Sequence, residues 1–143
     1  MNKEAILKSY LDHSKSVILL QANSKKPFGH SWKNLNLTFD QIITHEGNFG
    51  FEIPVENLIL DIDPRNGGLD SYKNLKENLK VEFIQTVKTP SGGFHIYLKI
   101  PDKYKNQKFP KKLTDYPGID CLTVGHYVVI PPSSIDNKWY SFI

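Results

Sequence analysis

The feature that most constrains this chain is a short apolar run that ends in two alternating aspartates. Residues 58–63 read Leu-Ile-Leu-Asp-Ile-Asp, and Pro-Arg-Asn-Gly-Gly follows. Such a run, closed by proline and glycine, is typical of a buried strand that ends in a turn. Residues two apart on a strand point to the same side, so Asp61 and Asp63 should project together. Mg²⁺ would neutralise this close pair of like charges and leave coordination sites for phosphate oxygens. The stretch therefore predicts a metal-binding strand end, with a solvated turn as the alternative.

Length and composition indicate one globular domain. The chain has 143 residues, of which 39% are hydrophobic and 12% aromatic, and a formal net charge of +3. This mild basicity is compatible with a polyanionic partner. The single cysteine, Cys121, excludes an internal disulfide framework and a multi-cysteine zinc site. No apolar run reaches the roughly 18–20 residues that a membrane span needs. The N-terminus lacks the apolar core of a signal peptide, so we expect a cytoplasmic protein.

Hydrophobic periodicity predicts a mixed α/β chain with more strands than helices. Helices are expected at 2–12, from a capping box at Thr38–Gln41 onward, and over 69–79. One strand is the apolar run that leads into Asp61. Further strands are expected at 16–20, 47–53, 82–88, 94–100, 119–122, 126–130 and 138–142. The segment 101–117 is rich in lysine and proline and is expected to be an exposed loop. Its lysines could lie along nucleic-acid phosphates, with a solvated loop as the alternative.

A glycine-rich turn forms the second chemical cluster. Residues 89–95 read Thr-Pro-Ser-Gly-Gly-Phe-His, between two expected strands. Consecutive glycines let backbone N–H groups converge on an anion, which makes a nest for phosphate. Ser91 adds a hydroxyl donor, and His95 could donate to a phosphate oxygen from the start of the next strand. The alternative is a plain hairpin turn followed by a structural histidine.

Asp120 and the pair Lys25-Lys26 are further charged positions that could contact a metal ion or a phosphate. Asp120 follows Gly118-Ile119 at an expected strand start, where an unpaired carboxylate would be costly and a metal shared with Asp61 and Asp63 would remove that cost. The alternative for Asp120 is a turn or cap aspartate. Lys25 and Lys26 precede a proline in a polar loop; they are either solvated or point charges for phosphates.

Together these motifs resemble the bifunctional DNA primase/polymerase domain of the archaeo-eukaryotic primase superfamily. The resemblance rests on Leu-Asp-Ile-Asp-Pro-Arg-Asn-Gly-Gly, Thr-Pro-Ser-Gly-Gly-Phe-His-Ile-Tyr, and Gly-Ile-Asp followed by Tyr-Val-Val-Ile-Pro-Pro-Ser, in that order. It runs from about residue 16 to residue 140, and includes the Lys-Pro element at 26–27 and an Asn-x-Gly strand at 48–50. The chain departs from the family at Phe94, where relatives commonly carry arginine, and at 121–124, which lack a basic residue.

The resemblance implies a fold and a set of roles. The fold is a primase/polymerase fold, a mixed α/β domain whose catalytic half is similar to an RNA-recognition-motif sheet. Asp61, Asp63 and Asp120 look like ligands of two Mg²⁺ or Mn²⁺ ions, and His95 joins them as a catalytic residue. The implied contacts to the nucleotide's triphosphate are Ser91, Gly92, Gly93 and His95, with Arg65 and Lys26 as weaker candidates.

The implied activity is template-directed nucleotidyl transfer by a two-metal mechanism, as a DNA primase, a DNA polymerase or both. Expected partners are a single-stranded DNA template, NTP or dNTP, and a helicase in the same or a separate chain. The setting would be replication of a phage, plasmid or other mobile element in a bacterial or archaeal cell. We expect residues 1–143 to be one catalytic domain, the N-terminal part of a longer protein. Two alternatives stay open: a non-catalytic nucleotide- or nucleic-acid-binding module, and another metal-dependent phosphoryl-transfer enzyme.

Overall fold

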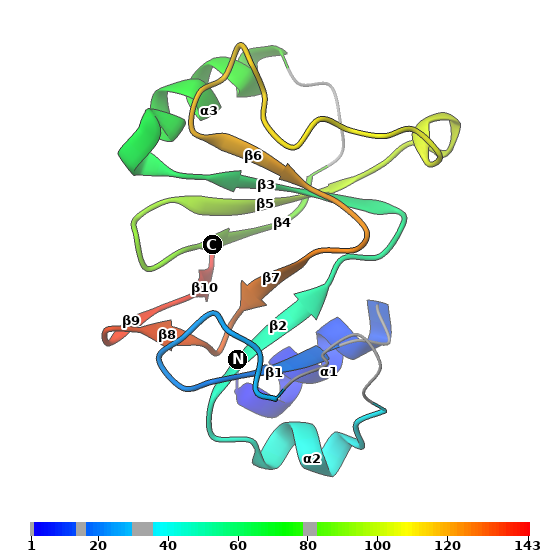
Figure 1. Cartoon of the computed structure of the whole chain (residues 1–143), viewed down its shortest axis with the longest axis vertical. Helices are drawn as coiled ribbons and strands as arrows, with labels where there is room; N and C mark the ends of the chain where they lie inside the picture. Colours follow the sequence, from blue (N-terminus) through cyan, green and yellow to red (C-terminus); the bar gives the residue numbers. More distant parts are fainter. Residues whose placement is uncertain (1, 14–16, 30–35, 79–82) are drawn as a thin grey trace. The chain divides into compact units, whose positions relative to one another are not determined.

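The chain forms two compact units, each with its own antiparallel sheet (Figure 1). The computed structural model describes residues 2–13, 17–29, 36–78 and 83–143. Unit 1 comprises Met1–Glu52 and Tyr127–Ser141, and unit 2 comprises Ile53–His126 and Phe142–Ile143. Helices and antiparallel strands are mixed in the chain, which confirms the predicted α/β (α+β) class. No helix among the described residues is long and apolar enough to cross a membrane.

Unit 1 is built on a three-stranded sheet in the order β1-β2-β7. The strands are β1 (Val17–Leu20), β2 (Asn48–Glu52) and β7 (Tyr127–Ile130), accompanied by the helices α1 (Lys3–His13) and α2 (Phe39–Thr44). The expected capping box starts α2: the Gln41 amide donates to the Thr38 hydroxyl (3.2 Å), and the Thr38 amide donates to the Gln41 side chain (2.8 Å). These two bonds satisfy backbone donors that a helix start leaves without partners.

A buried asparagine ties together distant segments of unit 1. Asn48 donates through Nδ2 to the carbonyl oxygens of Ser24 (3.0 Å) and Ser134 (2.8 Å), and its Oδ1 accepts from the Ser134 amide (3.0 Å). Ser134 begins the short hairpin of β8 (Ser134–Ile135) and β9 (Lys138–Trp139). The Asn48 side chain is therefore satisfied on both its donor and acceptor sides, as a buried amide requires.

Unit 2 contains a five-stranded sheet in the order β10-β4-β5-β3-β6. The strands are β3 (Asn57–Ile62), β4 (Phe83–Lys88), β5 (Phe94–Lys99), β6 (Ile119–Leu122) and β10 (Ser141–Phe142). The chain leaves β3, forms α3 (Gly68–Asn78) and returns as β4, while β5 inserts between β3 and β4. This is a split βαβ arrangement. The RNA-recognition-motif likeness of this half stays a prediction.

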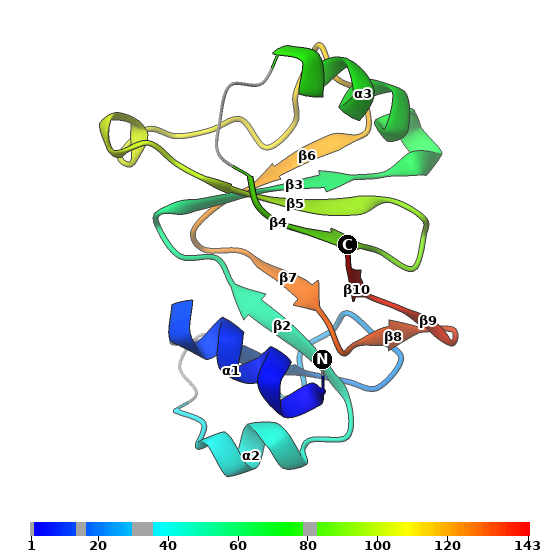
Figure 2. The same ribbon diagram turned by 180° about the vertical axis from the view of Figure 1, so that it is seen from behind.

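One face of the unit 2 sheet carries the apolar core. Buried side chains alternate along β3, β5 and β6, and α3 adds Leu75. Figures 1 and 2 show α3 beside β6 and β3 and away from β4. Leu69, which was expected on the buried stripe of this helix, is 44% exposed, while Leu79 lies outside the described residues. The helix therefore packs over only part of the sheet.

The structure departs from the expected elements at several places. The expected strand at 138–142 is divided into β9 and β10, and β8 and the 3₁₀ turns η1 (Pro64–Asn66) and η2 (Asp102–Tyr104) were not anticipated. The segment 101–117 keeps its lysines exposed but is not simply a solvated loop. Phe109, Leu113 and Tyr116 pack against the core, and the Cys121 amide donates to the Lys111 carbonyl at 2.7 Å, which covers the edge of β6.

Replacing Asn48 with alanine should destabilise the fold by about 2–3 kcal/mol, because the substitution leaves buried backbone groups without partners. Chemical denaturation would measure the change. Asn57→Ala is the matched control, since Asn57 makes one long side-chain bond, 3.4 Å to the Leu98 carbonyl. Equal losses of stability in the two variants would contradict the role given to Asn48.

Candidate active site

Strand pairing places three of the predicted site residues in one row. Asp61 of β3 lies directly opposite His95 of β5 on one side and opposite Asp120 of β6 on the other. Directly opposed residues of antiparallel strands point to the same face of the sheet. Leu60 and Ile62, the chain neighbours of Asp61, belong to the core on the other face. Asp61, His95 and Asp120 therefore share the sheet face that turns away from α3.

In this row the imidazole of His95 is buried, whereas the carboxylate of Asp61 is accessible to solvent. His95 Nε2 lies 3.6 Å from Asp61 Oδ1, and the two side chains are 8% and 41% exposed. Asp120 is half-buried. The strand backbones hold all three Cα positions, so little backbone entropy would be lost if a ligand bound here.

The second motif docks against the end of β3 through a glycine. A Cβ atom built on Gly93 would lie only 1.9 Å from the Ile62 carbonyl oxygen and 2.9 Å from Pro64 Cδ. No side chain fits in that space, so only glycine lets the turn approach the Asp-x-Asp segment this closely. The adjoining turn is the expected hairpin, closed by bonds from the Thr89 amide to the Gly93 carbonyl and from the Gly92 amide to the Thr89 carbonyl (both 3.0 Å).

The third motif docks on the same strand end through two more glycines. The Asp63 amide donates to the Gly118 carbonyl at 2.8 Å. A Cβ on Gly68 would meet the carbonyl oxygens of Asp63 (2.4 Å) and Gly118 (2.7 Å), and one on Gly118 would meet the Gly68 amide nitrogen at 2.5 Å. All three motifs therefore converge where β3 ends and where β5 and β6 begin.

Asp63 is engaged differently from Asp61. Its carboxylate caps η1 by accepting from the Arg65 amide (2.9 Å), and it also accepts from Arg65 Nε (3.1 Å) and Asn66 Nδ2 (3.0 Å). The side-chain hydrogen bond from Arg65, helped by the bond from its amide, lowers the pKa of Asp63 below the usual 3.8. In this arrangement the carboxylate is occupied as a helix cap.

The glycine turn itself presents polar groups to solvent. Ser91 and Gly92 are exposed, and Gly92 has a left-handed backbone (φ +88°) with open space around it. The Ser91 hydroxyl lies 3.0 Å from the Thr89 hydroxyl, so the two side chains share a hydrogen bond. An accessible turn with a hydroxyl and a left-handed glycine is the kind of backbone that can form an anion nest.

No three His, Cys, Asp or Glu side chains in the described part of the chain are already grouped as a ready metal site. Asp61 and Asp120 are nevertheless paired across neighbouring strands, and one or two carboxylates with substrate phosphates are the usual protein contribution to bound Mg²⁺. Asp61 and Asp120 therefore fit a divalent cation. Asp63 would complete the predicted ligand set only by giving up its bonds to Arg65.

The remaining predicted residues are placed as follows. Arg65 is exposed beside Asp63. Lys26 lies in unit 1, in a loop where the Gln21 amide donates to its carbonyl (2.9 Å) and its own amide donates to the Ser24 hydroxyl (3.0 Å). Phe94 faces the core side, with its ring 6.0 Å from that of Tyr72. It therefore adds nothing to the Asp61 row.

Two residues that contribute to the site's geometry escaped the sequence analysis. Asn66 holds the Asp63 carboxylate, and Thr89 contacts Ser91. Both lie inside motifs that were recognised, and an amide or hydroxyl at the edge of a turn is a common local hydrogen-bonding device. Attention to turn chemistry, in addition to the charged positions, would have identified them.

A comparison with known protein families identifies the class of protein. The chain matches the family Prim-Pol, described as "Bifunctional DNA primase/polymerase, N-terminal", over residues 7–143. It therefore belongs to this family, and membership indicates a primase/polymerase-type nucleotidyltransferase with a role in DNA replication. No curated protein matches the chain.

Gly93→Ala should destabilise the protein by roughly 2–4 kcal/mol, because the new methyl group meets backbone atoms that cannot move aside. Gly92→Ala is the matched control: space is open there, and only the cost of a left-handed backbone applies, about 1–2 kcal/mol. Thermal unfolding of both variants makes the comparison. If Gly93→Ala is the milder of the two, the turn does not dock as described.

Arg65→Gln should raise the pKa of Asp63 toward 3.8, since the side-chain bonds that favour its charged form are lost. A folded-state pKa below the unfolded one stabilises the protein above the unfolded pKa, and this stability is lost as the pH falls through the lowered value. NMR titration of the carboxyl carbons would measure the shift. Asp102, whose pKa is lowered by its hydrogen bond from Lys105, should titrate unchanged. An Asp63 titration that is the same in both proteins would disprove the assignment.

Proposed function

We propose that this chain catalyses template-directed nucleotidyl transfer on single-stranded DNA, as a primase, a polymerase or both. The observation that carries the proposal is the row of Asp61, His95 and Asp120 across three adjacent strands. Membership of the primase/polymerase family supports it. The three motifs that converge on β3 are also those on which the resemblance in sequence rests.

Asp61 and Asp120 are proposed to hold Mg²⁺ or Mn²⁺, two ions in all, with Asp63 as the third carboxylate. When bound, the ions would supply Lewis-acid stabilisation of charge on the phosphates and a lowered pKa for the attacking 3′-hydroxyl. The chain contributes two carboxylates on directly paired strands, which fixes the spacing of their Cα atoms before a ligand arrives.

The nucleotide's triphosphate is proposed to lie along the turn at residues 89–93 and against His95. The exposed Ser91 hydroxyl and the backbone of Gly92 would donate to phosphate oxygens. The buried imidazole of His95 lies within 3.6 Å of Asp61, so a carboxylate and a nitrogen donor are adjacent where metal and phosphate would meet. The exposed guanidinium of Arg65 is available for a further phosphate contact if it leaves Asp63.

The engagement of Asp63 by Arg65 is the one observation that favours a second candidate, a module that binds nucleotide or nucleic acid without catalysis. While the hydrogen bonds from Arg65 and Asn66 last, they occupy both oxygens of the Asp63 carboxylate and leave it no acceptor site for an ion. The two candidates differ in whether metal-dependent incorporation occurs, and the experiment below separates them.

Asp61→Asn should lower labelled-nucleotide incorporation on single-stranded DNA about 100-fold or more, since the substitution removes a charge at the reacting phosphates. Assays with Mg²⁺ and then Mn²⁺, with and without a primer, would also separate priming from extension. Asp102→Asn is the control, because Asp102 is an exposed carboxylate paired with Lys105 on η2 and should leave the rate unchanged.

Absence of incorporation by a folded wild-type protein that still binds nucleotide would favour the binding module. Incorporation that survives Asp61→Asn would refute the proposed site while leaving the activity itself standing.

A further inference from the structure

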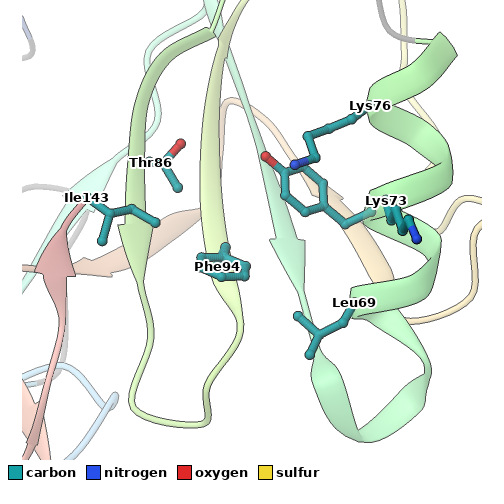
Figure 3. Close-up of a pocket in the computed structure, with 7 residues that line it drawn as sticks. Leu69, Lys73, Lys76, Thr86, Phe94 and Ile143 are labelled. Atoms are coloured by element: carbon teal, nitrogen blue, oxygen red, sulfur yellow. The ribbon is translucent and has the colours of Figure 1, made fainter.

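The core face of the unit 2 sheet has a groove that α3 leaves open. Figure 3 shows α3 on one side of it, Phe94 on the sheet, and Thr86 and Ile143 on the far side. Its volume is about 480 Å³, and it is lined by Leu69, Tyr72, Lys73, Lys76, Thr86, Phe94 and Ile143. The Asp61 row lies on the opposite face of the same sheet. The groove is therefore separate from the candidate active site.

The width of the sheet explains the groove. Five strands at about 4.8 Å spacing span roughly 19 Å, whereas one helix with its side chains is about 10–12 Å across. Since α3 contacts β3 and β6, it leaves β4 and β10 without a helix above them in the described part of the chain. Leu69 and Ile143, on the two sides of the groove, are 44% and 69% exposed. The open space has the position that a second helix would occupy on this face.

The charged residues on the wall of the groove are lysines, which favours a partner with acidic side chains. The lining residues of α3 are Leu69, Tyr72, Lys73 and Lys76, which is one stripe of the helix at i, i+3, i+4 and i+7. This stripe contains both lysines of α3 and neither of its acidic residues, Asp70 and Glu77. Lys76 Nζ lies 4.8 Å from the centre of the Tyr72 ring, so a cation is held directly over the apolar wall.

We propose that this groove docks an amphipathic helix of a partner protein, with an apolar face flanked by Asp or Glu residues. Aliphatic side chains would cover Phe94 and the methyl group of Thr86, and the carboxylates would meet Lys73 and Lys76. This is the helix-in-groove mode of recognition, in which apolar anchors supply affinity and rim charges supply selectivity. The proposal adds a protein-docking surface to the proposed function and does not depend on it.

The test is an NMR titration of the ¹⁵N-labelled protein with two synthetic helical peptides. One carries a leucine stripe flanked by glutamates, and the other is identical except that each glutamate is lysine. The acidic peptide should bind roughly fivefold tighter, as expected for two exposed charge pairs, and should shift the amide resonances of Leu69, Thr86 and Phe94.

A charge-reversal variant makes the test specific. Lys73→Glu/Lys76→Glu should invert the order of the two peptides, whereas Lys103→Glu/Lys108→Glu changes two exposed lysines outside the groove and should keep it. A dispersed NMR spectrum would show that each variant is folded. If a variant does not fold, the comparison of the two peptides on the wild-type protein still tests the proposal.

Equal binding of both peptides, or shifts confined to other elements, would overturn the proposal. So would a thymidine oligonucleotide that displaces the acidic peptide from these resonances, which would make the groove a nucleic-acid site. Sedimentation that shows a dimer whose formation blocks the peptide would instead assign the face to a second copy of the chain.

Discussion

The close backbone approach at the end of β3 is the constraint on which the rest of unit 2 depends. Gly93 lies against the Ile62 carbonyl, and Gly68 and Gly118 lie against each other and against Asp63. Because no Cβ fits at these contacts, the chain can bring a turn, a helix start and a third strand to one point. The row of candidate site residues follows from this approach. Once β5 and β6 start beside the end of β3, their pairing puts His95 and Asp120 next to Asp61.

The two aspartates of the Asp-x-Asp motif have separate structural duties. Asp61 lies within β3 on the sheet face opposite the core, whereas Asp63 lies just after the strand and caps η1. Arg65 and Asn66 stabilise the charged form of Asp63 at the cost of its freedom to bind elsewhere. A cation held by Asp61 and Asp120 that also recruited Asp63 would compete with Arg65 for the Asp63 carboxylate. Exchange between these partners would couple metal binding to the conformation of the Arg65 side chain.

The unit 2 sheet uses its two faces differently. One face carries Asp61, His95 and Asp120, and the other carries the apolar core with α3. Strand alternation separates them, because each residue in the row has core neighbours before and after it. A single helix is too narrow to cover five strands, so the core face keeps an open groove with two lysines on its wall. The proposed catalytic site and the proposed docking groove can therefore be tested independently, by substitutions on opposite faces of the sheet.

The sequence by itself determined the α/β class, most element positions and the identity of the three motifs, because strand periodicity, the Thr38–Gln41 capping box and the glycine-rich turns act locally. It also indicated Asp61, His95 and Asp120 as candidate site residues, but not that they form one row across the sheet. Register between distant strands decided this, and register depends on contacts such as Gly93 on Ile62 that no local pattern reveals. The capping role of Asp63, the partial cover by α3 and the packing of Phe109 onto the core were likewise decided by the tertiary structure. In each case the alternative arrangements share the same local elements and differ only in long-range packing. Sequence periodicity reports local structure and therefore cannot distinguish them.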